Sequence, residues 1–332
     1  MTAMRPTPCV YATVAAEEIA RFVSDRYGLG PVTSCRLLHR GFNDTYALAT
    51  GERRWMARLS RTGRRRSSDL EYEGALLAHL DRRGVPVGRC RLGENGRYSQ
   101  ILSAVDGPRW MMVFGYLEGR SVDDSPTDAM AQGETLACIH VESSDFTEHE
   151  GRISLDFEHL VDVPVRALCA LVADRPDAQA YLTELADRLR ARVSERSPGL
   201  AWGPCHGDCH GGNARIAPNG SAAFFDFDDG GPGWIAYDLA VFLWGPYAFA
   251  PHRRSLWRPF LEGYRRRHPI ERSDLDAVPI FIAIRHLWLL GEYAVGSPAW
   301  GSGWLDGWFG KQLDFLKGWE AEHLSNPLRL AI

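Results

Sequence analysis

Short runs of alternating apolar and polar residues fill roughly the first hundred positions, and this alternation predicts a β-sheet. Turn residues such as Asn95-Gly96 separate the runs. One helix interrupts them over residues 69–83, where leucine and alanine recur at helical spacing until Gly84 and Pro86 end the pattern. The predicted strands read CRLLHR, TYALAT, RWMARLS and YSQILSA.

Helical spacing replaces this alternation after the apolar run WMMVFGYLEG, which ends at Gly119. A chain of 332 residues is also long for one hydrophobic core, because such cores rarely grow past about 300 residues. We therefore expect an α+β protein with two lobes, residues 1–115 holding a sheet and one helix and residues 116–332 being mainly helical. The predicted helices of the second lobe cover 127–143, 178–195, 237–244 and much of the C-terminal third.

Composition and charge narrow the class of protein. Apolar residues make up 45% and charged residues 24%, as in an ordinary globular protein, and a net charge of -4 gives no general reason to bind nucleic acid or an anionic membrane. The seven cysteines include no C-x-x-C pair, which fits reduced thiols and a cytoplasmic location. The best candidate for a membrane span, VPIFIAIRHLWLLG, is broken by Arg285 and His286 before it reaches the required length.

The segment CHGDCHGGN, Cys205 to Asn213, allows two interpretations. Two Cys-His pairs suggest zinc, but one short loop rarely wraps four ligands around an ion, and no second pair follows at the usual distance. The alternative is H-x-D followed by four residues and Asn, the spacing of a kinase catalytic loop. In that loop Asp208 accepts a hydrogen bond from the acceptor hydroxyl, and Asn213 binds magnesium.

The residues that follow favour the kinase interpretation. NARIAPNGSAAFFDFDD reads as two short strands around Asn219-Gly220, a strong hairpin signal. Folding there brings Asn213 and Asp226 to the open end of one hairpin, where an amide oxygen and a carboxylate offer the hard ligands that Mg²⁺ prefers. Taken separately, each of these polar residues could be an ordinary turn or cap residue. Asp228 is a further candidate ligand.

These motifs resemble the aminoglycoside phosphotransferase and choline kinase family, which has the two-lobed fold of protein kinases with a small antiparallel N-lobe sheet. HGDCHGGN and FFDFDD look most like the bacterial branch that contains homoserine kinase-type enzymes and a stress-response Ser/Thr kinase. The similarity runs roughly from residue 36 to 245 and is most specific over 205–238.

The resemblance implies roles for several residues of the first lobe. The loop RGFNDTY would be the nucleotide loop, although an ordinary hairpin fits it equally well. Arg58 stands where protein kinases carry a phosphate-binding lysine, and Glu73 resembles the acid that holds that cation, with Glu71 as the competing choice. The backbone around 113–116 resembles the hinge that binds adenine. The residues implied in nucleotide binding are Gly41, Phe42, Asn43, Arg58, Glu73, Val113, Phe114 and Tyr116.

We therefore expect an ATP- and Mg²⁺-dependent kinase that phosphorylates a hydroxyl of a small molecule such as an antibiotic, a sugar or an amino alcohol. A Ser/Thr protein kinase and a non-catalytic nucleotide-binding protein remain the alternatives. Eight of the eleven tryptophans lie from Trp234 onward. Core packing and an aromatic wall for the acceptor are both open uses for them.

Overall fold

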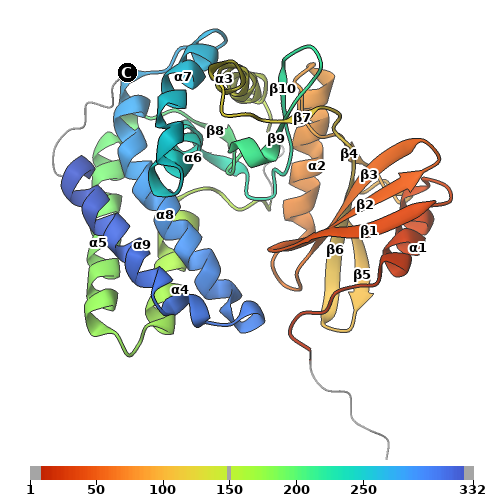
Figure 1. The fold of residues 1–332 in the computed structure, drawn as a ribbon, viewed down its shortest axis with the longest axis horizontal. Helices are drawn as coiled ribbons and strands as arrows, with labels where there is room; N and C mark the ends of the chain where they lie inside the picture. The colour runs from red at the N-terminus through yellow and green to blue at the C-terminus, as the bar shows by residue number, and fades with distance from the viewer. Residues whose placement is uncertain (1–8, 148–150, 325–332) are drawn as a thin grey trace, which may run out of the picture. The chain divides into compact units, whose positions relative to one another are not determined.

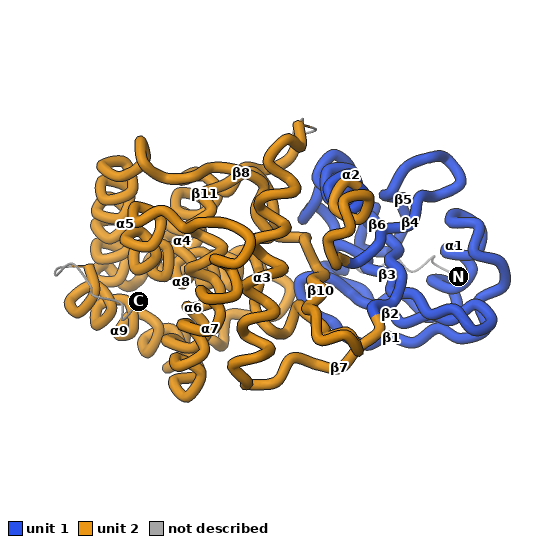
Figure 2. The backbone as a smooth tube through the Cα atoms, turned by 90° about the horizontal axis from the view of Figure 1, so that it is seen from above, with its two compact units in different colours: residues 1–78, 88–117 blue, residues 79–87, 118–332 orange. Residues whose placement is uncertain are grey.

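The computed structural model describes residues 9–147 and 151–324, whose fold is drawn in Figure 1. The chain divides into two compact units, shown in separate colours in Figure 2. Unit 1 comprises residues 1–78 and 88–117, and unit 2 comprises residues 79–87 and 118–332. The outermost parts of the two expected lobes, residues 1–8 and 325–332, lie outside the described residues.

Unit 1 is built on an antiparallel sheet in which β1, β2, β3, β6 and β4 lie side by side, while β5 pairs with the other end of β6. The four strands predicted from alternation all form, and the helix expected over 69–83 is α2. The elements are α1 (Ala16–Tyr27), β1 (Ser34–Arg40), β2 (Asn43–Thr50), β3 (Arg53–Ser60), α2 (Ser67–Arg82), β4 (Cys90–Arg91), β5 (Gln100–Ala104) and β6 (Gly107–Gly115), and the last turn of α2, from His79 on, counts with unit 2.

Helix α1 is an addition to what the pattern predicted. Its apolar residues Ile19, Val23 and Tyr27 recur at every fourth position and are fully buried against the sheet, so they close the core of unit 1. The hydroxyl of Tyr27 donates to the carbonyl of Met111 at 2.8 Å, which ties the end of the helix to β6. The helix stops at Gly28, whose φ of 58° suits a left-handed C-cap.

Unit 2 is mainly helical, as expected, and contains two small sheets. One has the order β10-β9-β7, and β11 pairs with β8 in the other. The elements are β7 (Arg120–Ser121), α3 (Pro126–Glu142), α4 (Val163–Leu171), α5 (Pro176–Arg196), β8 (Trp202–Cys205), β9 (Ala214–Ile216), β10 (Ala222–Phe224), β11 (Gly231–Trp234), α6 (Ile235–Ala248), α7 (Trp257–Arg265), α8 (Arg272–Trp300) and α9 (Trp308–Trp319).

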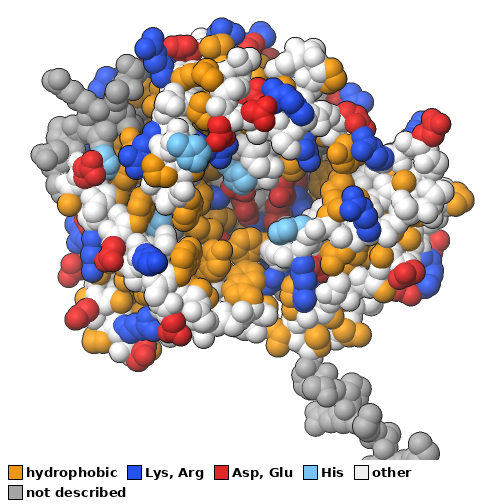
Figure 3. Space-filling view, viewed as in Figure 1, with side chains coloured by type: hydrophobic (Ala, Val, Ile, Leu, Met, Phe, Trp, Pro, Cys, Tyr) orange, Lys and Arg blue, Asp and Glu red, His pale blue; other side chains and the backbone are white. Residues whose placement is uncertain are grey.

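The long helix α8 forms the centre of unit 2, where it packs against α4, α5 and α6. By length and composition it is the one helix of the described residues that could span a membrane, but 78% of its apolar window is buried inside the fold. A core helix of a globular domain has this character. On the face drawn in Figure 3, acidic and basic side chains are interspersed, so neither sign of charge covers that face.

Candidate active site

The candidate catalytic loop, residues 206–213, leaves strand β8 and enters strand β9. Its first bend requires a glycine, because Gly207 has a φ of 80° and a Cβ there would lie 2.1 Å from the carbonyl oxygen of Asp229. The loop and the segment after β10 therefore pass each other at backbone distance. Any side chain at position 207 would push them apart.

His206 is a structural part of this loop. The side chain is fully buried between the rings of Phe224 and Phe227, and burial lowers its pKa, so the imidazole is neutral. Its Nε2 donates to the carbonyl of Phe225 at 3.1 Å, and its Nδ1 accepts the backbone N–H of Asp208 at 3.2 Å. The imidazole thus links the loop to the hairpin strand β10 and fixes where Asp208 begins.

The carboxylate of Asp238 accepts hydrogen bonds from the backbone of the same loop. Its two carboxylate oxygens accept the backbone N–H groups of His206 and Gly207 at 2.7 and 2.8 Å, and one of them also contacts His140 Nε2 at 3.0 Å. Asp238 lies in the first turn of α6, which begins at Ile235 and has Trp234 as its N-cap residue. The side chain of Asp238 therefore supports the loop rather than capping the helix.

Asp208 and Asn213 lie together at the end of the loop. The side-chain amide of Asn213 donates to Asp208 Oδ2 at 2.8 Å and to its backbone carbonyl at 2.9 Å. The other carboxylate oxygen, Oδ1, accepts a hydrogen bond from Arg285 of α8. Although burial alone would raise the pKa of Asp208, the Arg285 charge and His210 hold that pKa well below its usual range. Asp208 is therefore an ionised carboxylate at neutral pH.

The hairpin predicted from Asn219-Gly220 is confirmed. Strands β9 and β10 pair antiparallel, Gly220 has a φ of 85°, and the N–H of Phe225 donates to the carbonyl of Asn213 at 3.0 Å. Asp226 follows directly and, with a φ of 66°, is the one described non-glycine residue in the left-handed region. Such a conformation is held by its surroundings and is common at functional sites.

Arg152 fixes the segment that follows Asp226. Its buried guanidinium donates to the carbonyl of Asp228 at 2.6 Å and to the carbonyls of Phe227 and Gly230. Strand β11 then begins at Gly231, which leaves a connection of four residues after Asp226. Such a short connection has no room for the long activation segment with which protein kinases dock peptides.

The zinc interpretation of CHGDCHGGN finds no support in the described residues, because the four candidate ligands do not converge. The buried thiol of Cys209 donates to the carbonyl of Asp238 at 3.0 Å, and burial raises the pKa of Cys205 and Cys209 well above the ordinary value of a thiol. The potential metal ligands that do gather in this part of the described chain are His140, Cys205 and Asp238.

In unit 1, Arg58 and Glu73 form a buried bidentate ion pair between β3 and α2. The Arg58 side chain is 6% exposed and that of Glu73 is buried completely. Glu71, the competing choice, instead accepts the backbone N–H groups of Tyr98 and Ser99 at 3.1 and 2.9 Å. Glu73 and Glu71 of α2 therefore have different roles, and Glu73 is the acid that pairs with Arg58.

The loop Gly41-Phe42-Asn43 is a tight hairpin in which the N–H of Gly41 donates to the carbonyl of Asn43 at 3.0 Å. Arg61 donates to the carbonyl of Gly41, and the Arg64 guanidinium lies 4.7 Å from the centre of the Phe42 ring. The run RTGRRRSS therefore packs against this loop.

The strand expected to bind adenine is more constrained than the sequence suggested. β6 is paired on both sides, so Val113 faces Ala57 and Arg91, and Phe114 faces Met56 and Cys90. The N–H of Tyr116 donates to the backbone carbonyl of Arg54 at 3.1 Å. The backbone N–H groups of Val113, Phe114 and Tyr116 are therefore committed to the sheet, which removes them as donors to a nucleotide base.

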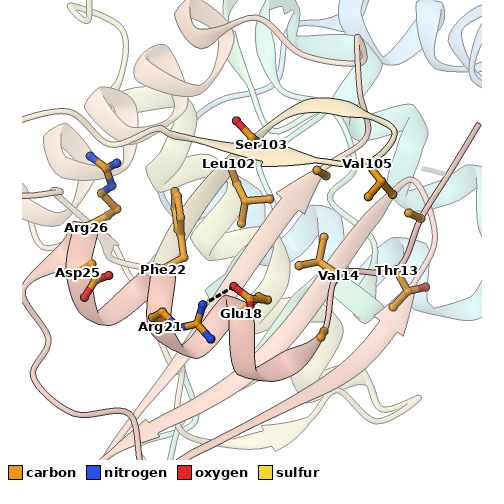
Figure 4. A pocket seen from close by; sticks show the side chains of 13 residues that line it. Thr13, Val14, Glu18, Arg21, Phe22, Asp25, Arg26, Leu102, Ser103 and Val105 are labelled. Carbon is orange, nitrogen blue, oxygen red and sulfur yellow. Dashed lines mark hydrogen bonds and ion pairs between the residues drawn. The ribbon is translucent and has the colours of Figure 1, made fainter. Parts of the chain in front are cut away.

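A surface pocket of about 510 Å³ lies in unit 1 between α1 and strand β5, and Figure 4 shows its lining. Phe22 and Leu102 supply apolar walls, while Glu18 and Arg21 pair with each other at its rim. None of the residues expected to bind the nucleotide lines this pocket. It plays no part in the candidate site.

The C-terminal tryptophans do not form one continuous helix. α8 ends at Trp300, a short 3₁₀ turn holds Trp304, and α9 begins at Trp308. The rings of Trp304 and Trp308 lie 5.6 and 5.0 Å from that of Tyr293, so these two pack together in one aromatic cluster. Trp300 is 36% exposed at the edge of that cluster.

A sequence model of the phosphotransferase enzyme family matches residues 34–272 of the chain. The chain belongs to this family. As a member of the phosphotransferase enzyme family it is an enzyme that transfers a phosphoryl group to a hydroxyl, which confirms the resemblance inferred from the HGDCHGGN and FFDFDD motifs.

Two relatives in sequence match most of the chain. An uncharacterized protein of Deinococcus radiodurans is 39% identical over 323 residues, which cover 96% of this chain and 94% of that protein. A homoserine kinase of Rhodopseudomonas palustris is 27% identical over 82% of this chain and 81% of that enzyme.

Two solved structures have a fold similar to that of this chain. An amicoumacin kinase in complex with AMP-PNP and Ca²⁺ has a TM-score of 0.73 at 18% identity and covers 92% of this chain and 93% of its own. A microcompartment-associated aminopropanol kinase has a TM-score of 0.70 at 23% identity, with 94% and 98% covered. The predicted two-lobed kinase-like fold is thereby confirmed.

Sequence reasoning missed the residues that support Asp208 from outside the loop. Arg285 stands 77 residues from Asp208, on a helix that the sequence marks only as apolar. A charged residue inside such a helix is itself a signal, because an arginine is rarely buried without a partner. Arg152 and His140 carry no comparable signal in the sequence.

Proposed function

We propose that this phosphotransferase transfers the γ-phosphoryl group of ATP to a hydroxyl of a small molecule, with Asp208 aligning that hydroxyl. The observation that carries the proposal is the double restraint on the Asp208 carboxylate, by the Asn213 amide on one oxygen and by Arg285 on the other. An ionised carboxylate held in this way accepts the hydrogen bond of an incoming hydroxyl in a fixed direction.

The residues of unit 2 fit a divalent cation. Asn213 uses its side-chain nitrogen for both bonds to Asp208, which leaves its amide oxygen as the ligand atom. We propose that Asn213 Oδ1 and the Asp226 carboxylate hold Mg²⁺, with Asp228 as a further acidic ligand. When bound, the ion would neutralise the charge that develops on the phosphates.

We further propose that unit 1 binds the nucleotide. Arg58, oriented by Glu73, would neutralise phosphate oxygens, and the hairpin Gly41-Phe42-Asn43 would cover them. The base cannot take the N–H groups of Val113, Phe114 or Tyr116, so the next residue, Leu117, is the proposed backbone contact for adenine. It lies where the pairing of β6 with β3 and β4 has ended.

The transferred group passes through a loose transition state, so most of the catalysis comes from alignment and charge neutralisation. As the bond between the acceptor oxygen and the γ-phosphorus forms, the bond from that phosphorus to the bridging oxygen of ADP breaks. The proton of the hydroxyl passes to the Asp208 carboxylate. Because Arg285 favours the ionised carboxylate, this proton transfer comes late, and the main task of Asp208 is to orient the hydroxyl.

Amino alcohols are the acceptors we propose to test first, since a homoserine kinase and an aminopropanol kinase are among the proteins this chain resembles. The experiment measures ADP release by the full chain with ATP, Mg²⁺ and either homoserine or aminopropanol, beside a panel of sugars and hydroxylated antibiotics. Phosphorylation of the protein itself is followed in parallel, because a protein kinase would show it.

Asp208→Asn should abolish ADP release while ATP still binds, since the amide keeps the shape but loses the negative charge. Asp177→Asn, on the exposed first turn of α5, is the matched control and should keep full activity. Undiminished turnover by Asp208→Asn would contradict the role of Asp208. Release of ADP with none of the acceptors would contradict the substrate class.

A further inference from the structure

Arg285 is a buried cation at the centre of unit 2. The side chain is 4% exposed, although it extends from a helix whose residues are mostly apolar and buried. Its Nη1 donates to the carbonyl of Gly207 at 3.2 Å and to the hydroxyl of Tyr237 at 3.3 Å, and its Nη2 donates to Asp208 Oδ1. Burying a charge costs free energy unless it is paired, so this one needs its partners in the catalytic loop.

Two tryptophans shape the slot in which the guanidinium lies. Its central carbon is 4.4 Å from the centre of the Trp288 ring and 5.1 Å from that of Trp244. Trp288 follows one turn later on α8 and Trp244 comes from α6, and both are buried. Indole faces attract a cation and leave a flat guanidinium little freedom to turn. The slot thus fixes the direction in which Arg285 meets Asp208.

The Asp208 carboxylate therefore accepts hydrogen bonds from two separate parts of the fold, the loop and helix α8. Asn213, at the end of its own loop, takes Oδ2, and Arg285, from α8, takes Oδ1. A carboxylate with one held oxygen can still swing about its χ2 torsion, whereas one held at both oxygens cannot. The second restraint also comes from the core of unit 2, so the orientation of Asp208 does not depend on the loop alone.

We propose that Arg285 is a positioning residue for phosphoryl transfer, which locks the Asp208 carboxylate in the orientation that receives the acceptor hydroxyl. The inference rests on the proposed function, because it assigns the alignment of Asp208 to a residue outside the catalytic loop. Arg285 acts through Asp208 and through the carbonyl of Gly207, so no contact between Arg285 and the acceptor is required. Tyr237 supports the guanidinium from α6.

The test compares Arg285→Lys, Arg285→Met and Arg285→Ala in the full chain with ATP, Mg²⁺ and homoserine. Arg285→Ala should lower kcat by about 10²-fold, because a misplaced catalytic group costs on that order, while KM for ATP stays within about twofold. Arg285→Lys keeps the charge and should recover part of kcat. Arg285→Met fills the slot without a charge and should remain as slow as Arg285→Ala.

Chemical rescue separates positioning from packing. Guanidinium chloride at millimolar concentration should restore turnover to Arg285→Ala, whereas sodium chloride and urea at the same concentrations should not. Melting temperature and tryptophan fluorescence of each variant confirm that the fold is retained. If the Arg285 variants do not fold, Tyr237→Phe takes their place, because it removes one partner of the guanidinium and should lower kcat several-fold with KM unchanged.

A crystal structure of Arg285→Ala supplies a readout that needs no turnover. We expect the Asp208 carboxylate to rotate away from the Asn213 amide, and to return in crystals soaked with guanidinium. An unchanged Asp208 orientation together with an unchanged kcat would overturn the inference while leaving the phosphotransferase proposal intact. Absence of ADP release from the unaltered protein with every acceptor would instead count against the proposed function.

Discussion

His140 and Asp238 form a fully buried hydrogen bond of 3.0 Å that joins α3 to α6 beneath the catalytic loop. The other side of the imidazole, Nδ1, lies 2.7 Å from the hydroxyl of Tyr264 on α7. The imidazole therefore links Asp238 to Tyr264, so three helices share one polar chain. The carboxylate at its end carries the backbone of His206 and Gly207.

Asp238→Asn should destabilise the protein by about 3 kcal/mol, because the amide offers one acceptor oxygen where two are used and turns an N–H group toward buried donors. Urea unfolding of the variant and of the parent measures the difference. Asp177→Asn, an exposed aspartate in the first turn of a helix, is the control for a charge lost without a buried partner. An equal midpoint for Asp238→Asn and the parent would show that the loop does not depend on this acid.

Glu73→Gln should weaken ATP binding about tenfold, which corresponds to about 1.4 kcal/mol, because Arg58 loses its bidentate partner and its fixed direction. Calorimetric titration of ATP into the variant measures this. Glu71→Gln is the matched control on the same helix, since its carboxylate serves the backbone of Tyr98 and Ser99. The control should lower stability and leave ATP affinity unchanged, and the reverse result would assign the roles the other way round.

Asn213→Ala should raise the Mg²⁺ concentration needed for half-maximal ADP release by on the order of 10-fold, because the variant loses a ligand oxygen. It also loses the donor that holds Asp208 Oδ2, so the maximal rate falls as well. Cys209→Ala is the control, since its thiol bonds to a carbonyl away from the proposed ligands. Stoichiometric zinc in purified protein, lost in Cys209→Ala, would revive the zinc interpretation.

His286 should make the protein less stable in mild acid. Burial lowers the pKa of His286 to about 3 from an ordinary value of 6.5. At a pH between these two values the imidazole is protonated in the unfolded chain and neutral in the folded chain. Stability contributed by the neutral imidazole is present above about pH 6.5 and is lost as the pH falls, by about 2 kcal/mol at pH 5.

His286→Gln removes this proton while its amide oxygen can still accept from Trp244 Nε1, as the imidazole Nδ1 does at 3.1 Å. Unfolding measured at pH 7 and pH 5 should therefore show a smaller drop for the variant than for the parent. The same drop in both proteins would mean that other groups set the acid sensitivity.

The sequence was sufficient where function depends on residues close together in the chain. Asp208 and Asn213 stand five positions apart, and Asn219-Gly220 marks the turn of the hairpin that precedes Asp226, so spacing and turn chemistry predicted the loop and hairpin that carry these candidate residues. The strands of unit 1 followed from alternation in the same way. Helix α1 was not predicted, because polar residues surround its three core positions in a segment with a low overall apolar content.

The contacts that support the catalytic loop from other helices could not be predicted from local sequence patterns. Arg285, His140 and Asp238 meet the catalytic loop through tertiary packing of α8, α3 and α6, and no local pattern encodes such contacts. Strand β6 gives a second example of a tertiary feature that the sequence did not reveal. Its apolar run is plain in the sequence, but the pairing on both sides that occupies Val113 and Phe114 depends on β4, a strand of two residues.

The buried thiol of Cys209 allows the opening of the catalytic loop to be measured by chemical labelling. Because its Sγ is bonded to the carbonyl of Asp238 and sheltered completely, a maleimide can reach it only when the loop opens away from α6. Cys9, exposed before the first helix, is labelled at once and can be replaced beforehand. The alkylation rate of Cys209 would then report the free energy of opening this loop, and a bound nucleotide or acceptor that closes the loop would slow the reaction in proportion to how tightly it binds the closed form.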